Sequence, residues 1–245
     1  VAEVLLELRD LTKPGITTGE LDQHARKAIR KRGVESSFLG YGPHGLPPYP
    51  GVLCVSVNDE IVHGIPGPRE LGEGDIVSLD FGAACEGYHG DSAVTLALGP
   101  VPAVAKKLVD VTRDALDRGI EQMVPGNRLS DIGHAVQVRA ESEGFSVVRQ
   151  FVGQGIGREM HEDTQVPNFV SAQLRRNGDF TLEPGLVIAV EPMVNMGTKH
   201  VKSLPDYWTQ ATQDARPSAH FEHTIAMTEN GPWVLTGPPQ PGEKT

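Results

Sequence analysis

An internal repeat constrains the fold more than any other feature of this sequence. Residues 13–34 (KPGITTGELDQHARKAIRKRGV) align with residues 124–145 (VPGNRLSDIGHAVQVRAESEGF), 111 positions later. In both copies a Pro-Gly pair precedes an amphipathic segment that ends at a glycine, which predicts a turn, a helix and a helix stop. In the first copy, Thr17 and Glu20 also have the spacing of a helix capping box.

The same offset relates two apolar runs, each of which ends in an acidic residue. The run EGDIVSLD ends at Asp80, and the run PGLVIAVE ends at Glu191. Pro-Gly turns before helices are common, so coincidence is the alternative, but one offset shared by helix, glycine and strand favours duplication. We expect one α/β (α+β) domain over residues 1–238, with halves at about 1–101 and 102–238 that join near residues 99–104. Residues 239–245 are expected to form a disordered tail.

Composition excludes several classes of partner. The formal net charge of -10 would repel a nucleic-acid backbone. Cys54 and Cys85 are too few for a disulfide framework and fit a reducing, cytoplasmic compartment. No apolar run is long enough to cross a membrane. The first residues, VAEVLLELRDL, predict a helix and lack an initiator Met, so we expect upstream residues to be missing.

Four acidic residues lie on or at the ends of apolar strands, where an isolated carboxylate would be costly to bury. They are Asp80, Asp91, Glu191 and Glu222. A hairpin centred on Cys85-Glu86 would place Asp80 opposite Asp91. A strand end that reaches solvent would explain any one acid, but four together favour a shared cation site. Carboxylates suit Mn²⁺, Co²⁺, Fe²⁺ or Mg²⁺, and a pair of such ions is a hydrolytic arrangement.

Glycine and histidine residues give weaker signals of the same site. The segment GQGIG, residues 153–157, has glycine at every second position, which predicts a close approach of its backbone to another element. His63 and His161 could be core or surface residues, and beside the carboxylates they would serve as donors or proton carriers. His89 precedes Asp91 by two positions and is expected to support it. The remaining candidates are expected to be ordinary surface residues: His24, His44, His134, His200 and His220.

Five segments in order resemble the type I methionine aminopeptidases, from about Ala2 to about Leu235. These segments are SVNDEIVHGIPG, IVSLDFGAACEGYHGDSA, VGQGIGREMHEDTQVPNF, VIAVEPMV and FEHTIAMTENG. The resemblance implies the pita-bread fold, in which two halves related by a pseudo-twofold axis hold a dinuclear metal site between them. It also disfavours a dinucleotide motif at GQGIG, because no βαβ unit with an acid about 20 residues further on surrounds it.

The resemblance implies roles for the four acids. Asp80 would bind one metal ion through both oxygens, and Asp91 and Glu222 would bridge two ions. Glu191 would bind metal and also handle the proton of the attacking water. The two ions would be drawn from Mn, Co, Fe, Zn or Mg, and a bridging hydroxide would attack the first peptide bond.

The resemblance also assigns catalytic and substrate-binding side chains. His63 would lie near the peptide nitrogen and the substrate N-terminus, and His161 would hydrogen-bond the scissile carbonyl. The side chain of the substrate methionine would lie in a pocket formed by Tyr41, Tyr49, Cys54 and Trp208.

Three departures from the family pattern bear on metal binding and specificity. Gln154 stands where the family has a histidine ligand, so we expect one metal ion to be held weakly, with a bias toward oxygen-preferring ions. Phe38 replaces a small pocket residue and Met160 replaces a bulky aromatic one, which changes the space for a methionine side chain. An insertion at residues 42–48 (GPHGLPP) is expected to remodel the pocket rim.

The expected function is that of a cytoplasmic, monomeric, metal-dependent aminopeptidase. It would remove N-terminal Met from peptides or from nascent chains, where the ribosome is a further candidate partner. One alternative is a specialised pita-bread hydrolase of Xaa-Pro bonds or small amides. The other is a weakly active or inert paralogue that binds peptide N-termini, although all four acids and both candidate histidines are retained.

Overall fold

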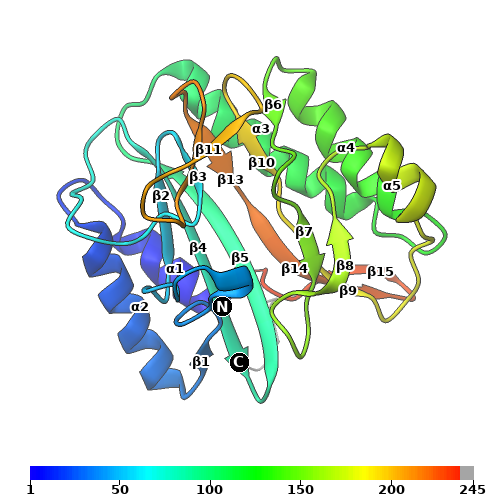
Figure 1. Cartoon of the computed structure of the whole chain (residues 1–245), viewed down its shortest axis with the longest axis horizontal. Coiled ribbons are helices and arrows are strands. Elements are labelled where there is room, and N and C mark those ends of the chain that lie inside the picture. The colour runs from blue at the N-terminus through cyan, green and yellow to red at the C-terminus, as the bar shows by residue number, and fades with distance from the viewer. Residues whose placement is uncertain (238–245) are drawn as a thin grey trace.

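A nine-stranded antiparallel sheet dominates the part of the chain that the structure describes, residues 1–237 except the side chains of His44, Gln173 and Asn177. In this computed structural model the strands follow the order β1-β4-β5-β14-β9-β7-β8, while β2 pairs with β4 and β15 with β14 (Figure 1). The strands are β1 (Glu35–Ser36), β2 (Cys54–Val57), β4 (Ile76–Cys85), β5 (Tyr88–Ala97), β7 (Gly153–Gly155), β8 (Glu162–Val166), β9 (Val187–Val190), β14 (Glu222–Thr228) and β15 (Gly231–Val234). The predicted tail, residues 239–245, lies outside the described residues.

Two three-stranded sheets and several helices surround the main sheet. The first small sheet joins β13 (Ser218–His220), β10 (Met193–Asn195) and β6 (Ser146–Val147), and the second joins β11 (Val201–Ser203), β12 (Gln210–Thr212) and β3 (Glu60–Val62). The helices are α1 (Ala2–Leu11), α2 (Thr18–Arg32), α3 (Ala103–Glu121), α4 (Leu129–Glu141), α5 (Ala172–Asn177) and the 3-10 helix η1 (Pro43–Gly45). No helix among the described residues combines the length and apolarity needed to cross a membrane.

The 111-residue offset found in the sequence recurs in the structure. The starts of α2 and α4, of β1 and β6, and of β4 and β9 are each 111 positions apart. Two isolated bridges, Thr17 with Glu70 and Arg128 with Thr181, obey the same offset. These repeated features support the predicted duplication of a helix-and-strand unit, and the exact boundary between the halves stays a prediction.

Local sequence explains the turn before each repeated helix and both ends of α2. Gly15 and Gly126, the turn glycines of the two copies, both have φ of 94°, a left-handed conformation that favours glycine. Thr17 and Glu20 form the predicted capping box at the start of α2. Gly33 ends α2 in the left-handed conformation, with φ of 64°.

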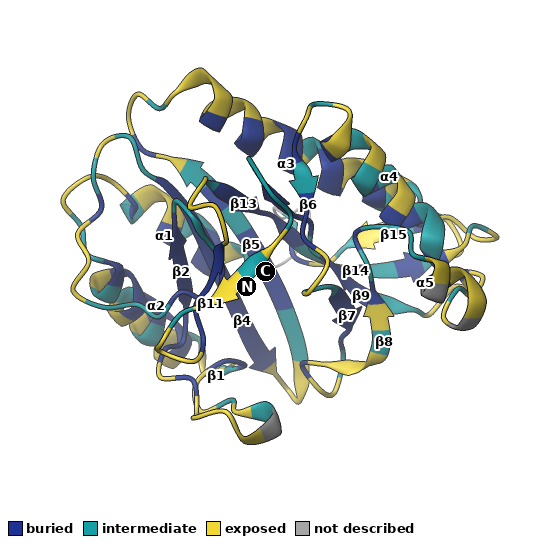
Figure 2. Ribbon diagram, turned by 45° about the horizontal axis from the view of Figure 1, so that its top comes forward, coloured by how far each residue is buried: buried dark blue, intermediate teal, exposed yellow. Residues whose placement is uncertain are grey.

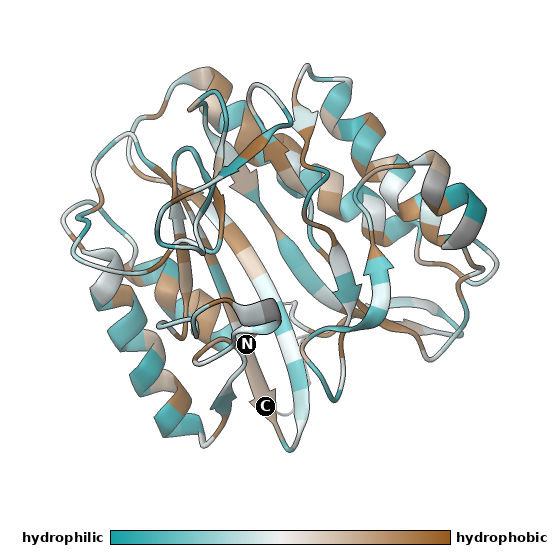
Figure 3. Cartoon of the chain, viewed as in Figure 1, coloured by the Kyte–Doolittle hydropathy of each residue, from teal (hydrophilic) through white to brown (hydrophobic). Residues whose placement is uncertain are grey.

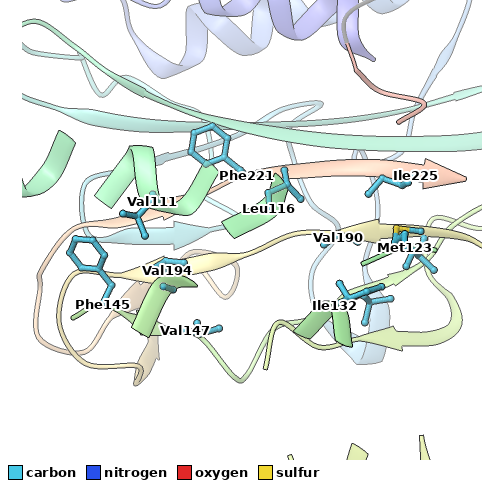
Figure 4. Close-up of a cluster of buried hydrophobic side chains, with 14 of the residues drawn as sticks. Val111, Leu116, Met123, Ile132, Phe145, Val147, Val190, Val194, Phe221 and Ile225 are labelled. Carbon is cyan, nitrogen blue, oxygen red and sulfur yellow. The ribbon is translucent and has the colours of Figure 1, made fainter. Parts of the chain in front are cut away.

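The buried apolar side chains form two large clusters that follow the two halves. One joins α1 and α2 to β2, β4 and nearby loops, and the other joins α3 and α4 to β9, β10 and β14. The second cluster includes Val111 and Leu116 of α3 together with Phe221 and Val190 (Figure 4). Figure 2 shows that the helices expose their outer sides, and Figure 3 shows bands of hydrophilic residues along α2 and α4. The amphipathic helices therefore cover the sheet, as their sequence pattern predicts.

The β4–β5 hairpin corrects the predicted register. Its turn residues are Glu86 and Gly87, both with positive φ, so the hairpin is centred one residue later than predicted. Asp80 lies opposite Ala93, and Asp91 lies opposite Gly82. A tight turn with two positive φ values favours glycine at its second position, which selects Glu86-Gly87 over Cys85-Glu86. Because the register shifts by two positions, Asp80 and Asp91 remain on the same face as diagonal neighbours.

Candidate metal and substrate site

One cavity of about 440 Å³ is lined by every residue that the sequence analysis assigned to the site. The assigned carboxylates and the assigned Gln lie in the same cavity as the assigned histidines and pocket residues. These residues are Phe38, Tyr41, Tyr49, Cys54, His63, Asp80, Asp91, Gln154, Met160, His161, Glu191, Trp208 and Glu222.

Four neighbouring strands each bring one carboxylate to this cavity. Asp80 lies on β4, Asp91 on β5 and Glu222 at the start of β14, while Glu191 directly follows β9. These strands are consecutive in the sheet, in the order β4-β5-β14-β9. The acids at the repeated positions 80 and 191 therefore enter from the outer two strands of the four, one from each half.

Three of the carboxylates converge closely enough to share a cation. Asp80, Asp91 and Glu222 each offer an oxygen, and these oxygens all lie within 4.8 Å of one another. Asp80 Oδ1 and Glu222 Oε1 are buried and lack a hydrogen-bond partner among the described residues. Buried polar atoms without partners are rare in folded proteins, so these oxygens fit the binding of a cation.

The electrostatics of the cavity also favour a bound cation. Burial raises the pKa of Asp91 to about 7, and burial together with the neighbouring acids raises the pKa of Asp80, Glu191 and Glu222 well above the usual range. No Lys or Arg is among the described residues that line the cavity. A set of carboxylates with no cationic side chain is the donor chemistry of hard and borderline divalent metal ions, so these residues fit such an ion.

The glycine-rich segment lies against the strand that leads to Glu191. A Cβ atom on Gly153 would come within 2.2 Å of the Ala189 carbonyl oxygen of β9, so only glycine fits there. This contact confirms the close backbone approach predicted from the sequence. It places Gln154, 8% exposed, on the cavity wall together with the carboxylates.

His161 and His63 have different surroundings. The Nδ1 atom of His161 is 2.7 Å from the Tyr41 hydroxyl, a hydrogen bond between residues 120 positions apart. His63 packs edge-on against Phe151 and Trp208, and burial lowers its pKa to about 4, so it is neutral at pH 7. Its φ of 60° is rare for a residue with a side chain and marks local strain of the kind found at functional sites.

The predicted substrate pocket is a buried aromatic cluster next to the carboxylates. Its buried members are Phe38, Tyr49, Cys54, Met160 and Trp208. The indole N–H of Trp208 donates a 2.9 Å hydrogen bond to the carbonyl of Pro47, inside the predicted insertion. The insertion thus contacts the pocket wall, and Pro43 and Leu46 also line the cavity.

His220 corrects the sequence analysis, which expected a surface residue. Its side chain is 1% exposed, and its Nε2 lies 3.8 Å from Glu191 Oε2 and 3.9 Å from Glu222 Oε2. The sequence does contain a signal for this position, because side chains two residues apart in an extended chain point to the same side, as His220 and Glu222 do. A break at Phe221, between β13 and β14, interrupts the strand and hides this signal. Burial lowers the pKa of His220 to about 3, so its imidazole is neutral.

The other histidines need less revision. His134 and His200 are exposed, as expected, and His24 is half-buried with a 3.0 Å contact to Glu7. The side chain of His44 lies outside the described residues. His89 Nδ1 is 2.8 Å from the Ser37 hydroxyl, so its observed hydrogen bond is with Ser37 and not with Asp91.

Comparison with known proteins agrees with this geometry. Residues 1–229 match the model of metallopeptidase family M24. Methionine aminopeptidase 1 of Bacillus subtilis is 50% identical over 230 residues, which are 94% of this chain and 89% of the relative. Methionine aminopeptidase 1 of Mycobacterium tuberculosis is 41% identical over 243 residues, 96% of this chain and 88% of the relative.

Solved structures agree with the sequence comparison. The crystal structure of methionine aminopeptidase from Thermotoga maritima has a TM-score of 0.90 and 42% identity, covering 97% of this chain and 92% of that one. Xaa-Pro dipeptidase from Bacillus anthracis shares the fold, with a TM-score of 0.72 and 21% identity, covering 98% of this chain and 58% of that one. The predicted pita-bread fold and the metal-dependent hydrolase class are confirmed. The chain belongs to the type I methionine aminopeptidases of metallopeptidase family M24.

Proposed function

We propose that this protein removes N-terminal Met from peptides and nascent chains by metal-dependent hydrolysis of the first peptide bond. One observation carries the proposal: buried carboxylates with unpaired oxygens border a buried aromatic pocket within one cavity. The carboxylates would bind the metal ions that act on the peptide bond, and the pocket would bind an apolar side chain. The names of the relatives, which are methionine aminopeptidases, support Met as that side chain.

The cavity is proposed to hold two divalent ions, drawn from Mn, Co, Fe, Zn or Mg. Asp80, Asp91 and Glu222 would hold them together with Glu191, and the amide oxygen of Gln154 is a further, neutral candidate ligand. Bound ions would act as Lewis acids on a carbonyl group and would lower the pKa of water. The three carboxylate oxygens within 4.8 Å of one another support this assignment most directly.

Glu191 and the two histidines of the cavity would transfer protons and orient the substrate. Glu191 would take the proton of the attacking water and pass it to the leaving nitrogen. His161 would donate its Nε2 proton to the scissile carbonyl oxygen, because the Tyr41 hydroxyl at Nδ1 can fix the ring in that tautomer. Neutral His63 would lie near the peptide nitrogen and the free amine of the substrate.

The pocket residues would set specificity for the first side chain. Tyr49, Cys54 and Trp208 would form its wall with Tyr41, and Phe38 and Met160 would reshape the space available to methionine. Trp208 is held by its hydrogen bond to Pro47, so the insertion at residues 42–48 would fix the rim. The protein is further proposed to act as a cytoplasmic monomer on nascent chains, with the ribosome as a further candidate partner.

The proposal is tested with metal-free protein and a Met-Ala peptide. Added Mn²⁺ or Co²⁺ should restore release of Met, and Glu191→Gln should lower kcat by at least about 100-fold because the proton acceptor is lost. Xaa-Pro dipeptides and small amides serve as competing substrates. Faster turnover of either competitor would favour the specialised-hydrolase alternative, and metal binding without any turnover would favour the peptide-binding paralogue.

A further inference from the structure

The imidazole of His220 is a buried polar group near the site, and the proposed function gives it no role. It is 1% exposed, and neither ring nitrogen has a hydrogen-bond partner among the described residues. A buried imidazole normally has a partner for at least one ring nitrogen, so an unpartnered imidazole is suited to bind a ligand. Its Nε2 faces Glu191 and Glu222, which the proposed function already assigns to metal binding.

The distances from His220 to the two glutamates are typical of side chains that bind one metal ion together, and they are too long for hydrogen bonds. His220 Nε2 is 3.8 Å from Glu191 Oε2 and 3.9 Å from Glu222 Oε2, beyond the range of a hydrogen bond. Metal bonds from nitrogen or carboxylate oxygen are about 2.0–2.2 Å long, so two donors on one ion lie at most roughly 4.4 Å apart. Both observed separations are inside that limit.

The backbone holds His220 independently of the carboxylates. The Thr95 hydroxyl donates to the His220 carbonyl at 2.7 Å, and it accepts from the His220 N–H at 2.8 Å. His220 also pairs with Met193 across β10 and β13. The imidazole is therefore presented to the carboxylates by the sheet framework, which is how a preformed ligand is positioned.

We propose that His220 is a nitrogen ligand of a divalent ion that Glu191 and Glu222 also bind. This inference rests on the proposed metal site and changes the expectation drawn from Gln154. That expectation, one weakly held ion, assumed that no imidazole replaces the histidine absent at position 154. His220 supplies such an imidazole from a different strand, so both ions are held tightly in the natural sequence.

The direct test is pulsed electron paramagnetic resonance of the Mn²⁺-loaded protein, which detects nitrogen bonded to the ion. The natural protein should show imidazole coupling, and His220→Gln should abolish it. His223→Gln is the matched control: it is a partly buried histidine three positions further on, and its substitution should preserve the coupling. Coupling that persists in His220→Gln, with folding verified by circular dichroism, overturns the inference.

Metal affinity provides the second test, by calorimetric titration of metal-free protein with Mn²⁺. His220→Gln should weaken one site by about 10- to 100-fold or more, as loss of a ligand requires. Gln154→His should add little in the natural protein but should restore affinity in the His220→Gln background. Equal affinities for the natural protein and His220→Gln contradict the inference.

These readouts separate the inference from the proposed function. Imidazole coupling and tight binding without cleavage of Met-Ala peptide would uphold the ligand role of His220 and reject the function. Cleavage with no change in coupling or affinity in His220→Gln would uphold the function and reject the ligand role.

Discussion

Asp91 is held in place by contacts from both halves of the chain. Its N–H donates to the Thr224 hydroxyl at 2.9 Å, and the same hydroxyl donates to the Asp91 carbonyl at 2.8 Å. The N–H of Ser92 donates to Asp91 Oδ1 at 3.0 Å. One carboxylate oxygen is thus fixed by the protein, which leaves the other free to bind a cation without much loss of side-chain entropy.

The Tyr41–His161 hydrogen bond gives a prediction about catalysis. Tyr41→Phe should lower kcat for Met-Ala peptide about 10-fold and change KM little, because the ring of His161 loses the partner that fixes its tautomer. Tyr88→Phe is the control, since Tyr88 is 53% exposed at the hairpin and outside the cavity lining. Steady-state kinetics decide the question, and equal kcat values for both variants would remove Tyr41 from the mechanism.

Phe38 gives a prediction about specificity. Phe38→Cys should raise kcat/KM for Met-Ala peptide by up to about 10-fold, because a buried ring of the pocket cluster is replaced by a small side chain. The same change should destabilise the protein by about 2–4 kcal/mol, since it removes a large buried side chain. Phe38→Leu should give an intermediate result. Unchanged kcat and KM in Phe38→Cys would show that Phe38 does not limit the pocket.

At the scale of elements, β7 shows how a short glycine-rich strand determines the site. Gly153 lets β7 approach β9 closely, and this approach places Gln154 beside the strand that directly precedes Glu191. The β4–β5 hairpin has a similar role, because its turn sets which residues of the two strands are neighbours. In both cases backbone geometry positions polar side chains of the site.

Gly153→Ala tests this account of β7. Its Cβ would lie 2.2 Å from the Ala189 carbonyl oxygen, and a backbone atom cannot move aside as a flexible side chain can. We expect a loss of about 1–3 kcal/mol in the free energy of unfolding and weaker metal binding through displaced Gln154. Gly67→Ala is the control, since its Cβ would meet no atom within 4 Å. Urea unfolding of both variants tests the prediction, and equal stabilities would contradict it.

Much of this arrangement is predictable from the sequence, because the repeat and the acids at apolar strand ends are local patterns. The hairpin register was wrong by two positions because it depended on which pair forms the turn, and Gly87 decides that. His220 was missed because the alternation that links it to Glu222 crosses a strand break. The contact between Tyr41 and His161 has no sequence signal, since it joins distant segments only after folding.

At the scale of the whole molecule, each of the two halves brings carboxylates to a shared centre. Without bound metal, this convergence lowers the stability of the fold once the carboxylates ionise. The pKa of Asp91 is raised to about 7 in the folded protein, and the pKa values of Asp80, Glu191 and Glu222 are also raised well above their usual range. A raised folded pKa contributes stability at low pH that is lost as the pH rises through that pKa. The metal-free fold therefore becomes less stable as its centre ionises.

This linkage predicts that the metal-free protein loses stability as the pH rises from about 6.5 through 7, where the folded pKa of Asp91 lies. With EDTA present, the free energy of unfolding should fall by about 1.4 kcal/mol per pH unit for each carboxyl that stays protonated only when folded. The buried histidines add no slope there, because their pKa values are lowered and they are neutral in both states above about pH 6.5. Mn²⁺ should restore stability at pH 9. Unfolding curves that are flat with pH in EDTA would contradict the account.

The central claim is that carboxylates from four neighbouring strands converge on divalent ions, and anomalous diffraction from crystals grown with Mn²⁺ tests it most directly. The account predicts anomalous peaks within about 2.0–2.6 Å of oxygens of Asp80, Asp91, Glu191 and Glu222. A map without any peak among these four side chains, from protein that cleaves Met-Ala peptide in the same Mn²⁺ solution, would contradict it.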